Sequence, residues 1–330
     1  AADLTVAEPV DYVKVCDAFG AGFFYSPGTD TCIKVGGYVE FGTSFGDTDF
    51  GRFNAGYDNS NWGNFYTEVS IQLTASSVTE YGNLTGFIDM RAKTANKSGE
   101  NGTYADLVNE STNSAYVDSA YLELGPIKAG YFTSLFDFGR GYTDTGAFGR
   151  GYDDTGMFGS DSTTDHIQLT YAVNGFGLAL SVEDNRDRGA LGYGEYTYNG
   201  NTYEGGNDNV PDIIGAVTYS SGIFSAKVAG AYVNQAFDWV DNDSKAGWAI
   251  GGGLEIALDN ISAGDRFFVS AAYGDNANSF TGISGGTSVA GTLALDNNGS
   301  HFAGSSWSAL ASYKHVWTPQ LWSSLSGGYA

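Results

Sequence analysis

The sequence predicts an all-β protein, and more specifically a transmembrane antiparallel β-barrel. Three observations carry this prediction. The 330 residues include 48 Gly, 21 Phe and 22 Tyr but only 15 Lys plus Arg and 5 Pro, so strand formers and turn residues dominate. From residue 33 onward, about thirteen short segments have strand composition. The connections between these segments alternate between long and short, as they do in outer-membrane barrels.

Side chains alternate most clearly in residues 68–75, 167–173 and 248–256. In 68–75 the odd positions, among them Val69, Ile71 and Leu73, are apolar, while the even positions are polar. Strands that cross an outer membrane need only about 9 to 11 residues and point alternate side chains toward lipid and lumen. No apolar run approaches the ~20 residues of a membrane helix, so we expect the chain to cross a membrane with strands.

The predicted connections fall into two length classes. Long polar connections are expected at 46–61, 94–112, 133–164, 184–211, 234–244 and 276–303. Tight turns are expected near Ser77 to Asn83, Gly125-Pro126, Asn174-Gly175, Ser221-Gly222, Asn260 to Gly264 and Thr318-Pro319. Aromatic residues mark the strand ends, as membrane-interface girdles require: Phe65, Tyr81, Phe176, Tyr219, Phe267, Tyr273, Tyr313 and Trp317. A soluble β-sandwich or an exported β-solenoid is the alternative, but neither explains the two length classes and no short internal period supports a solenoid.

The charge argues against one class of partner, and the N-terminus indicates an exported protein. A formal net charge of -23, without any basic cluster, argues against a nucleic-acid partner. The chain begins at Ala1-Ala2-Asp3 without Met, as expected after a signal peptide is removed. Export makes Cys16 and Cys32 oxidisable, and we expect them to form a disulfide that closes a loop before the first strand; two buried free thiols are the alternative.

Three segments resemble the alphaproteobacterial porin family. Residues Val10 to Tyr38, VDYVKVCDAFGAGFFYSPGTDTCIKVGGY, closely resemble its N-terminus, and the segments Gly130 to Asp137 and Lys314 to Pro319 match further along. The resemblance implies homotrimers of barrels with about 16 strands, each barrel enclosing its own aqueous channel.

The chain would then consist of an N-terminal segment 1–32, on the periplasmic side or in the lumen, and a barrel from 33 to 330. This barrel is about three strands short of the family's number, so we expect it to be C-terminally incomplete; the alternative is that our strand count is wrong.

The third long connection, 133–164, folds into the barrel and narrows the channel in the resembled family. The residues support an unusual role, because the segment is long and carries four Phe and two Tyr at positions 136, 138, 142, 148, 152 and 158. We therefore expect it to pack against a wall. It also contains a tandem decapeptide, FGRGYTDTGA at 138–147 and FGRGYDDTGM at 148–157. A local duplication that merely lengthened a loop is the plainer interpretation of this repeat.

The candidate site residues are charged groups on this loop and on the facing wall. The loop carries Asp137, Arg140, Asp144, Arg150, Asp153, Asp154 and Asp161, and its net charge is negative. Strand parity points Lys34, Arg91, Lys93, Lys128 and Lys227 into the lumen. An acidic loop opposite a basic wall would orient dipolar solutes, as rings of charge do in channels. The alternative is that each basic residue is simply solvated.

The sequence therefore predicts an outer-membrane porin for passive diffusion of small hydrophilic solutes and ions. Its expected surroundings are outer-membrane lipid and lipopolysaccharide. His166, His301 and His315 are scattered, so we expect no enzyme activity, and we expect no cofactor and no metal site. Inward faces rich in Gly, Ala and Ser favour an open channel. The alternatives are a substrate-specific channel, or a surface adhesin or structural barrel with a filled lumen.

Overall fold

The structure is a computed structural model, and it describes most of the strand-forming part of the chain. The described residues are 14–45, 63–94, 115–138, 142, 163–184, 196–198, 201–203, 210–237, 243–275, 277–281, 294–295, 301–302 and 305–329. No helix within these ranges is long and apolar enough to cross a membrane.

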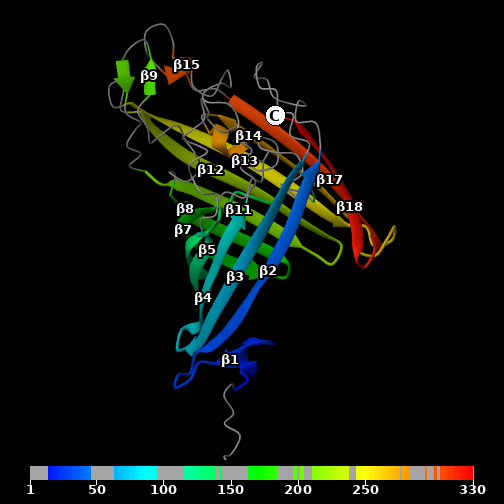
Figure 1. Cartoon of the computed structure of the whole chain (residues 1–330). Helices are drawn as coiled ribbons and strands as arrows, with labels where there is room; N and C mark the ends of the chain where they lie inside the picture. The colour runs from blue at the N-terminus through cyan, green and yellow to red at the C-terminus, as the bar shows by residue number, and fades with distance from the viewer. Residues whose placement is uncertain are drawn as a thin grey trace, which may run out of the picture.

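One antiparallel sheet of fourteen strands dominates the described residues (Figure 1). Its strands are β1 (Phe24–Tyr25), β2 (Cys32–Phe45), β3 (Gly63–Thr79), β4 (Gly82–Thr94), β5 (Ala115–Leu124), β6 (Ile127–Thr133), β7 (Thr163–Val173), β8 (Phe176–Glu183), β11 (Asp212–Ser220), β12 (Phe224–Phe237), β13 (Asp243–Ala257), β14 (Arg266–Asp275), β17 (Ser305–Thr318) and β18 (Leu321–Tyr329). Two small hairpins lie in long connections: β9 (Tyr196–Tyr198) with β10 (Asn201–Tyr203), and β15 (Ala294–Leu295) with β16 (His301–Phe302). The 3-10 turns η1 (Asp17–Phe19) and η3 (Asn278–Thr281) complete the described elements.

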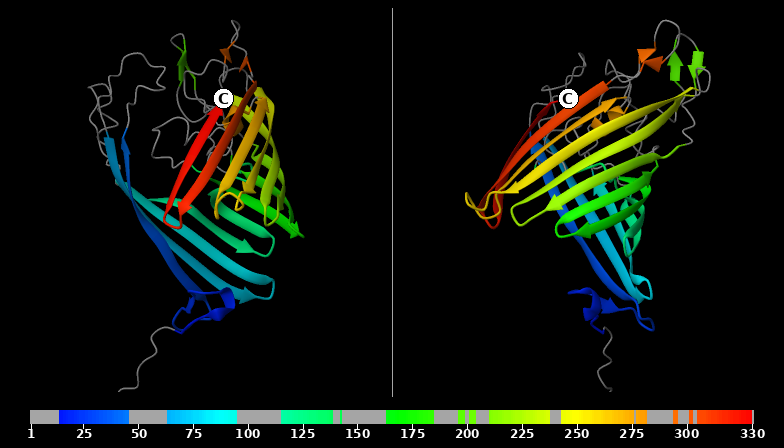
Figure 2. Two further views of the ribbon diagram at one scale, coloured as in Figure 1. Left: turned by 90° about the vertical axis from the view of Figure 1, so that its right-hand side faces the viewer. Right: turned by 180° about the vertical axis from the view of Figure 1, so that it is seen from behind.

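The strand order follows the chain, so each large strand pairs with the one before it and the one after it. One of the fourteen strands is the two-residue β1, and the other thirteen match the number that the sequence predicts. The sheet curls into an open barrel wall, and within the described residues β18 is not paired with β2 (Figure 2). The segment around β1 lies at one end of the wall and the C-terminus at the other, as an odd number of crossing strands requires (Figure 1). The predicted all-β, antiparallel fold is confirmed.

The predicted tight turns are confirmed, whereas the predicted long connections lie mostly outside the described residues. Tight turns join β3 to β4, β5 to β6, β7 to β8, β11 to β12 and β17 to β18, while β13 and β14 are joined through residues 258–265. Asn174 and Gly175 both have positive φ, 50° and 82°, which suits the two-residue hairpin turn between β7 and β8. The connection between β12 and β13 is shorter than predicted, because these strands extend to Phe237 and from Asp243.

The two faces of the sheet differ as period-two alternation requires. On β7, Ile167 and Leu169 are 61% and 51% exposed on the outer face, while Thr164 and His166 are buried on the inner face. On β13, Trp248 and Ile250 are exposed outside and Ala249 is buried inside. Within the described residues, the outer face is therefore an exposed apolar surface, and most of the polar and small residues of the strands lie on the inner face.

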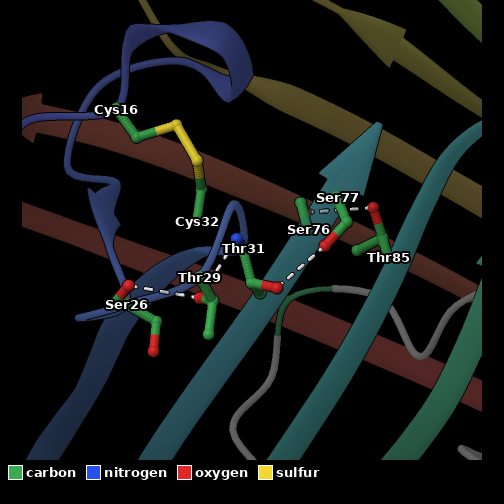
Figure 3. The surroundings of a disulfide bond; sticks show 8 residues. All are labelled: Cys16, Ser26, Thr29, Thr31, Cys32, Ser76, Ser77 and Thr85. Carbon is green, nitrogen blue, oxygen red and sulfur yellow. Dashed lines mark hydrogen bonds between the residues drawn. A yellow bond between two sulfur atoms is a disulfide. The ribbon is translucent and has the colours of Figure 1, made fainter. Parts of the chain in front are cut away.

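The N-terminal segment is tied to the start of β2 by a disulfide between Cys16 and Cys32, as predicted (Figure 3). Backbone hydrogen bonds from Cys16 N to the Phe23 carbonyl, 3.0 Å, and from Tyr25 N to the Lys14 carbonyl, 2.8 Å, close the segment on itself. The hydroxyl groups of Thr31 and Ser77 lie 3.0 Å apart and link it to β3 (Figure 3). The segment is thereby held against the short-turn end of the sheet.

Candidate functional site

The chain leaves β6 and turns at once onto the inner face of the sheet. Ser134, Leu135, Phe136 and Asp137, which open the long connection after β6, are all buried. This burial is unusual for loop residues, because a loop on the surface would leave them in water. The connection therefore begins inside the curled wall, where its backbone and side chains need partners from the strands.

Glu183 at the end of β8 provides the first of these partners. Its carboxylate is 1% exposed and accepts three hydrogen bonds. The donors are the Ser134 hydroxyl at 2.6 Å, the Leu135 backbone N–H at 2.8 Å and the Ser181 hydroxyl at 2.7 Å. Hydrogen bonds to a charged acceptor are stronger than neutral ones, so Glu183 fixes the direction in which the loop leaves β6.

Phe136 anchors the loop in an apolar cluster on the inner face. Its side chain is fully buried and meets the ring of Phe280 from η3 edge-on, with the centroids 4.9 Å apart. The wall beneath consists largely of small residues, Ala216, Ala229, Ala231, Ala249 and Ala272, with Ile214 and Val233. Fully burying a phenylalanine side chain stabilises a fold by about 1.5–3 kcal/mol.

Beyond Phe136 the loop continues along the wall toward β17. The ring of Phe138 stacks on Phe268 of β14, with centroids 5.5 Å apart and planes 15° apart. The Tyr142 hydroxyl donates to Glu255 of β13 at 2.7 Å, and its backbone N–H donates to the Ser312 hydroxyl of β17 at 2.9 Å. Burial and the hydrogen bond to Glu255 raise the pKa of Tyr142 above its ordinary value, so this hydroxyl remains a donor.

The predicted basic wall residue Lys227, on β12, is part of this attachment. Its ammonium group donates to the backbone carbonyl of Asp137 at 2.7 Å. Of the seven predicted charged loop residues, Asp137 is therefore in contact with a predicted wall residue, but through its backbone. The other six, Arg140, Asp144, Arg150, Asp153, Asp154 and Asp161, lie outside the described residues. The predicted arrangement of an acidic loop opposite a basic wall, which would orient dipolar solutes, stays a prediction.

Arg91 lies on a different part of the inner face, between two carboxylates. It is 3.0 Å from Asp89 on its own strand and 3.0 Å from Asp118 on β5. Asp89 is buried and also accepts hydrogen bonds from Ser70 and Gln72. Around Arg91, then, two acids accompany one base.

The remaining predicted basic residues occupy separate positions. Lys93, also on β4, is opposite Glu68 in the backbone register with β3. The Lys128 ammonium group lies over the rings of Tyr121 and Phe132, 3.6 and 4.0 Å from their centroids. Lys34 lies beside the N-terminal segment, with its ammonium group 5.9 Å from the ring centroid of Phe23. Among the described side chains, those of Arg91, Lys128 and Lys34 do not form one cluster.

Comparison with known proteins identifies the family. The sequence model of a porin subfamily matches residues 3–326. The chain belongs to this porin family. Porin Omp2b of Brucella canis is 33% identical over 245 residues, which are 72% of this chain and 62% of the relative. Porin Omp2b of Brucella abortus is 33% identical over 244 residues, with the same two shares. The matched part of the chain thus spans less than two thirds of the length of these curated relatives.

A solved structure shows the same fold. The outer membrane channel DcaP of Acinetobacter baumannii superposes with a TM-score of 0.65, at 17% sequence identity, over 92% of this chain and 80% of that chain. At this identity the likeness concerns the fold alone.

The outer face of this porin matches an outer-membrane location. A row of exposed aromatic residues crosses five strands near the long-connection end: Tyr232, Trp248, Tyr273, Trp307 and Tyr329. A second group, Phe176, Tyr219 and Phe224, lies at the short turns. On β12 the two groups are eight residues apart, which is about 26 Å along the strand and about 20 Å of height at the tilt of about 40° that barrel strands have. An apolar band about 25 Å tall between aromatic girdles is typical of outer-membrane barrels, and this is where the chain resides.

The sequence analysis missed several residues that hold the loop. Glu183, Glu255, Phe268 and Phe280 contact it from four different elements: β8, β13, β14 and η3. Parity places Glu255 on the inner face, but nothing local indicates that it receives Tyr142 from 113 positions away. Asp118 was missed because a bulge between β4 and β5 shifts the register next to Asp89.

Proposed function

We propose that the complete protein forms a water-filled channel through which small hydrophilic solutes and ions diffuse passively, and that it acts as a channel and not as an enzyme. The observation that carries this proposal is the start of the third loop, buried on the inner face of a sheet whose outer face is apolar and exposed. A loop attached inside a membrane barrel reduces the cross-section of the channel without blocking it. A homotrimer of such barrels, as the family resemblance implies, would give three parallel channels.

We further propose that the constriction lies between the third loop and the inner face around Arg91. Arg91, Asp89 and Asp118 present fixed charges there, and fixed charges favour hydrated solutes over apolar ones. The predicted loop residues Arg140, Asp144, Arg150, Asp153, Asp154 and Asp161 would face them across the water.

Deleting Phe138 to Ala147 tests the constriction. Phe148 then follows Asp137, and Tyr152 follows Phe148 at the same spacing as Tyr142 follows Phe138. The shortened loop therefore keeps a Phe and a Tyr that can contact Phe268 and Glu255. Arg140 and Asp144 leave together, so the formal charge is unchanged. Single-channel conductance in a planar bilayer should rise, while the ratio of cation to anion permeability stays the same.

The matched control is deletion of Phe148 to Met157, which also removes ten residues but leaves Phe138 and Tyr142 in place. It removes Arg150, Asp153 and Asp154, so conductance should rise and cation preference should fall slightly. Parent-like conductance and an unchanged size cutoff for neutral sugars in both deletions would contradict the constriction. Conductance that saturates with one solute would instead identify a substrate-specific channel, and absence of stepwise conductance would favour a filled barrel.

A further inference from the structure

We infer that Gly253 on β13 is a positioning residue that sets how far the third loop projects into the channel. It does so by leaving space for the ring of Phe138. This inference rests on the proposed function, because it assumes that the third loop narrows the channel. Gly253 itself need not touch any solute.

The geometry at Gly253 leaves no room for a side chain. A Cβ atom there would overlap Cδ1 of Phe138 and lie 2.7 Å from Cε1 and 3.1 Å from Cγ of the same ring. Separations below about 3 Å do not occur between such atoms, so the ring would have to move. The backbone at Gly253 does not have the positive φ that would itself demand glycine. The requirement for glycine therefore comes from the ring.

The ring has little freedom to move along the wall. It also stacks on Phe268 of the same wall, with ring centroids 5.5 Å apart and planes 15° apart. Phe268 is itself buried and pairs with Glu255, the residue that binds Tyr142. Displacement of the Phe138 ring is thus directed away from the wall, toward the lumen.

A single cross-strand pair holds two consecutive residues of the loop. Gly253 is directly opposite Lys227 in the register between β13 and β12. Lys227 binds the backbone carbonyl of Asp137, and Gly253 receives the side chain of Phe138. One partner thus fixes the height of the backbone above the wall while the other fixes the depth of the ring. A methyl group at position 253 would change the depth of the Phe138 ring without removing the hydrogen bond from Lys227 to the Asp137 carbonyl.

The test is a double-mutant cycle in the full-length protein reconstituted in a planar bilayer. Gly253→Ala should lower single-channel conductance and the size cutoff for neutral sugars, and Gly253→Val should lower both further. In a Phe138→Ala background the same Gly253→Ala change should have no effect on conductance, because the ring that it displaces is gone. Equal losses with and without Phe138, or parent-like conductance of Gly253→Val, would overturn the inference.

The matched control is Gly215→Ala on β11. Gly215 lies on the outer face, and a Cβ atom there would meet nothing within 4 Å, so the change should leave conductance as it is. Thermal unfolding of the four variants in the cycle distinguishes failure of this inference from failure of the proposed function. If positions 253 and 138 are coupled in unfolding but not in conductance, Phe138 packs against Gly253 but the third loop is not the constriction. If they are coupled in neither, Phe138 does not pack against Gly253.

Discussion

Two stretches of the same inner face have opposite characters. We call the inner face of β3–β6 the polar wall and the inner face of β11–β14 the loop-bearing wall. The polar wall carries Arg91 between Asp89 and Asp118, and Lys128 over two aromatic rings. The loop-bearing wall carries many Ala and Gly at inward positions, together with Lys227, Glu255 and Phe268, and is covered by Phe136 and Phe138.

The difference shows that one barrel uses its inner face in two ways. Along the polar wall, Arg91 lies between two carboxylates, and the side chains of Arg91 and Asp118 stay partly accessible to water. Along the loop-bearing wall, small residues provide the space into which the loop packs, so that this wall works like the core of a soluble protein. Small inward residues, which the sequence analysis took as a sign of an open channel, here make room for the loop that occupies it.

The largest loss of stability should come from removing the ring of Phe136 that packs on the loop-bearing wall. Phe136→Ala removes a fully buried ring and leaves a cavity against Phe280, and such changes cost about 3–5 kcal/mol of unfolding free energy. The control is Phe41→Ala on β2, whose side chain is 68% exposed on the outer face and leaves no internal cavity. Denaturant unfolding in detergent or lipid measures both. Equal destabilisation by the two changes would erase the distinction between the walls.

A smaller loss of stability should follow when the loop loses its hydrogen-bond acceptor, the Glu183 carboxylate at the end of β8. Glu183→Ala removes the acceptor of the Ser134 hydroxyl and of the buried Leu135 N–H, and a buried donor left unsatisfied costs about 1–3 kcal/mol. We expect a destabilisation of about 2–4 kcal/mol together with noisier single-channel currents, because the base of the loop is no longer fixed. Glu123→Ala on β5, an exposed position, is the control and should change neither. Quiet, parent-like currents from Glu183→Ala would show that Phe136 and Phe138 hold the loop without it.

The polar wall should respond in ion preference more than in stability. Arg91→Gln removes the positive charge between Asp89 and Asp118, and the pair with Asp118, in which both side chains are 26% exposed, contributes only about 1 kcal/mol to stability. The cation-to-anion permeability ratio, measured as a reversal potential, should rise at 0.1 M salt and much less at 1 M, where charges are screened within about 3 Å. Arg266→Gln makes the same charge change at the short-turn end, beside Asp259, and should leave the ratio unchanged. A shift toward anions in Arg91→Gln would contradict this assignment.

Local patterns in the sequence were enough to predict the fold. Period-two alternation assigns Ile167 and Leu169 to the outer face, and turn-forming pairs such as Asn174-Gly175 mark where strands reverse. Both signals act over a few residues, and antiparallel neighbours joined by short turns need little else. The disulfide between Cys16 and Cys32 was predictable for a related reason, because only two cysteines exist to pair.

The candidate site depended on contacts that no local pattern encodes. The aromatic content of the third loop indicated that it packs against a wall, but the seats at Gly253, Phe268 and Glu255 are more than a hundred positions away. Lys227 was assigned to the lumen by parity, and only the structure shows it bound to the Asp137 carbonyl. Parity gives the direction of a side chain, whereas the partner depends on how the sheet curls.

The smallest effect concerns the attachment of the loop-bearing wall to the last hairpin. Asp265, just before β14, is buried and accepts hydrogen bonds from the Tyr313 hydroxyl at 2.7 Å, the Val316 N–H at 2.8 Å and the His315 Nδ1 at 2.8 Å. Burial alone would raise the pKa of Asp265, but these three donors outweigh it and lower the pKa from 3.8 to about 2. Because the pKa is depressed in the folded state, the stabilisation is present above pH 3.8 and is lost as the pH falls through about 2.

The unfolding temperature of the parent should therefore fall more steeply between pH 4 and pH 2 than that of Asp265→Asn, which has no carboxylate to titrate there. The nearby Asp259 also has a lowered pKa, chiefly through the Gly264 N–H and then through Arg266, so Asp259→Asn is the necessary control. Asp259 is exposed and joins no strands of the hairpin, so its removal should leave most of the steepness in place. If Asp265→Asn and the parent lose stability in parallel over this range, the β14 turn is not what ties the loop-bearing wall to β17 and β18.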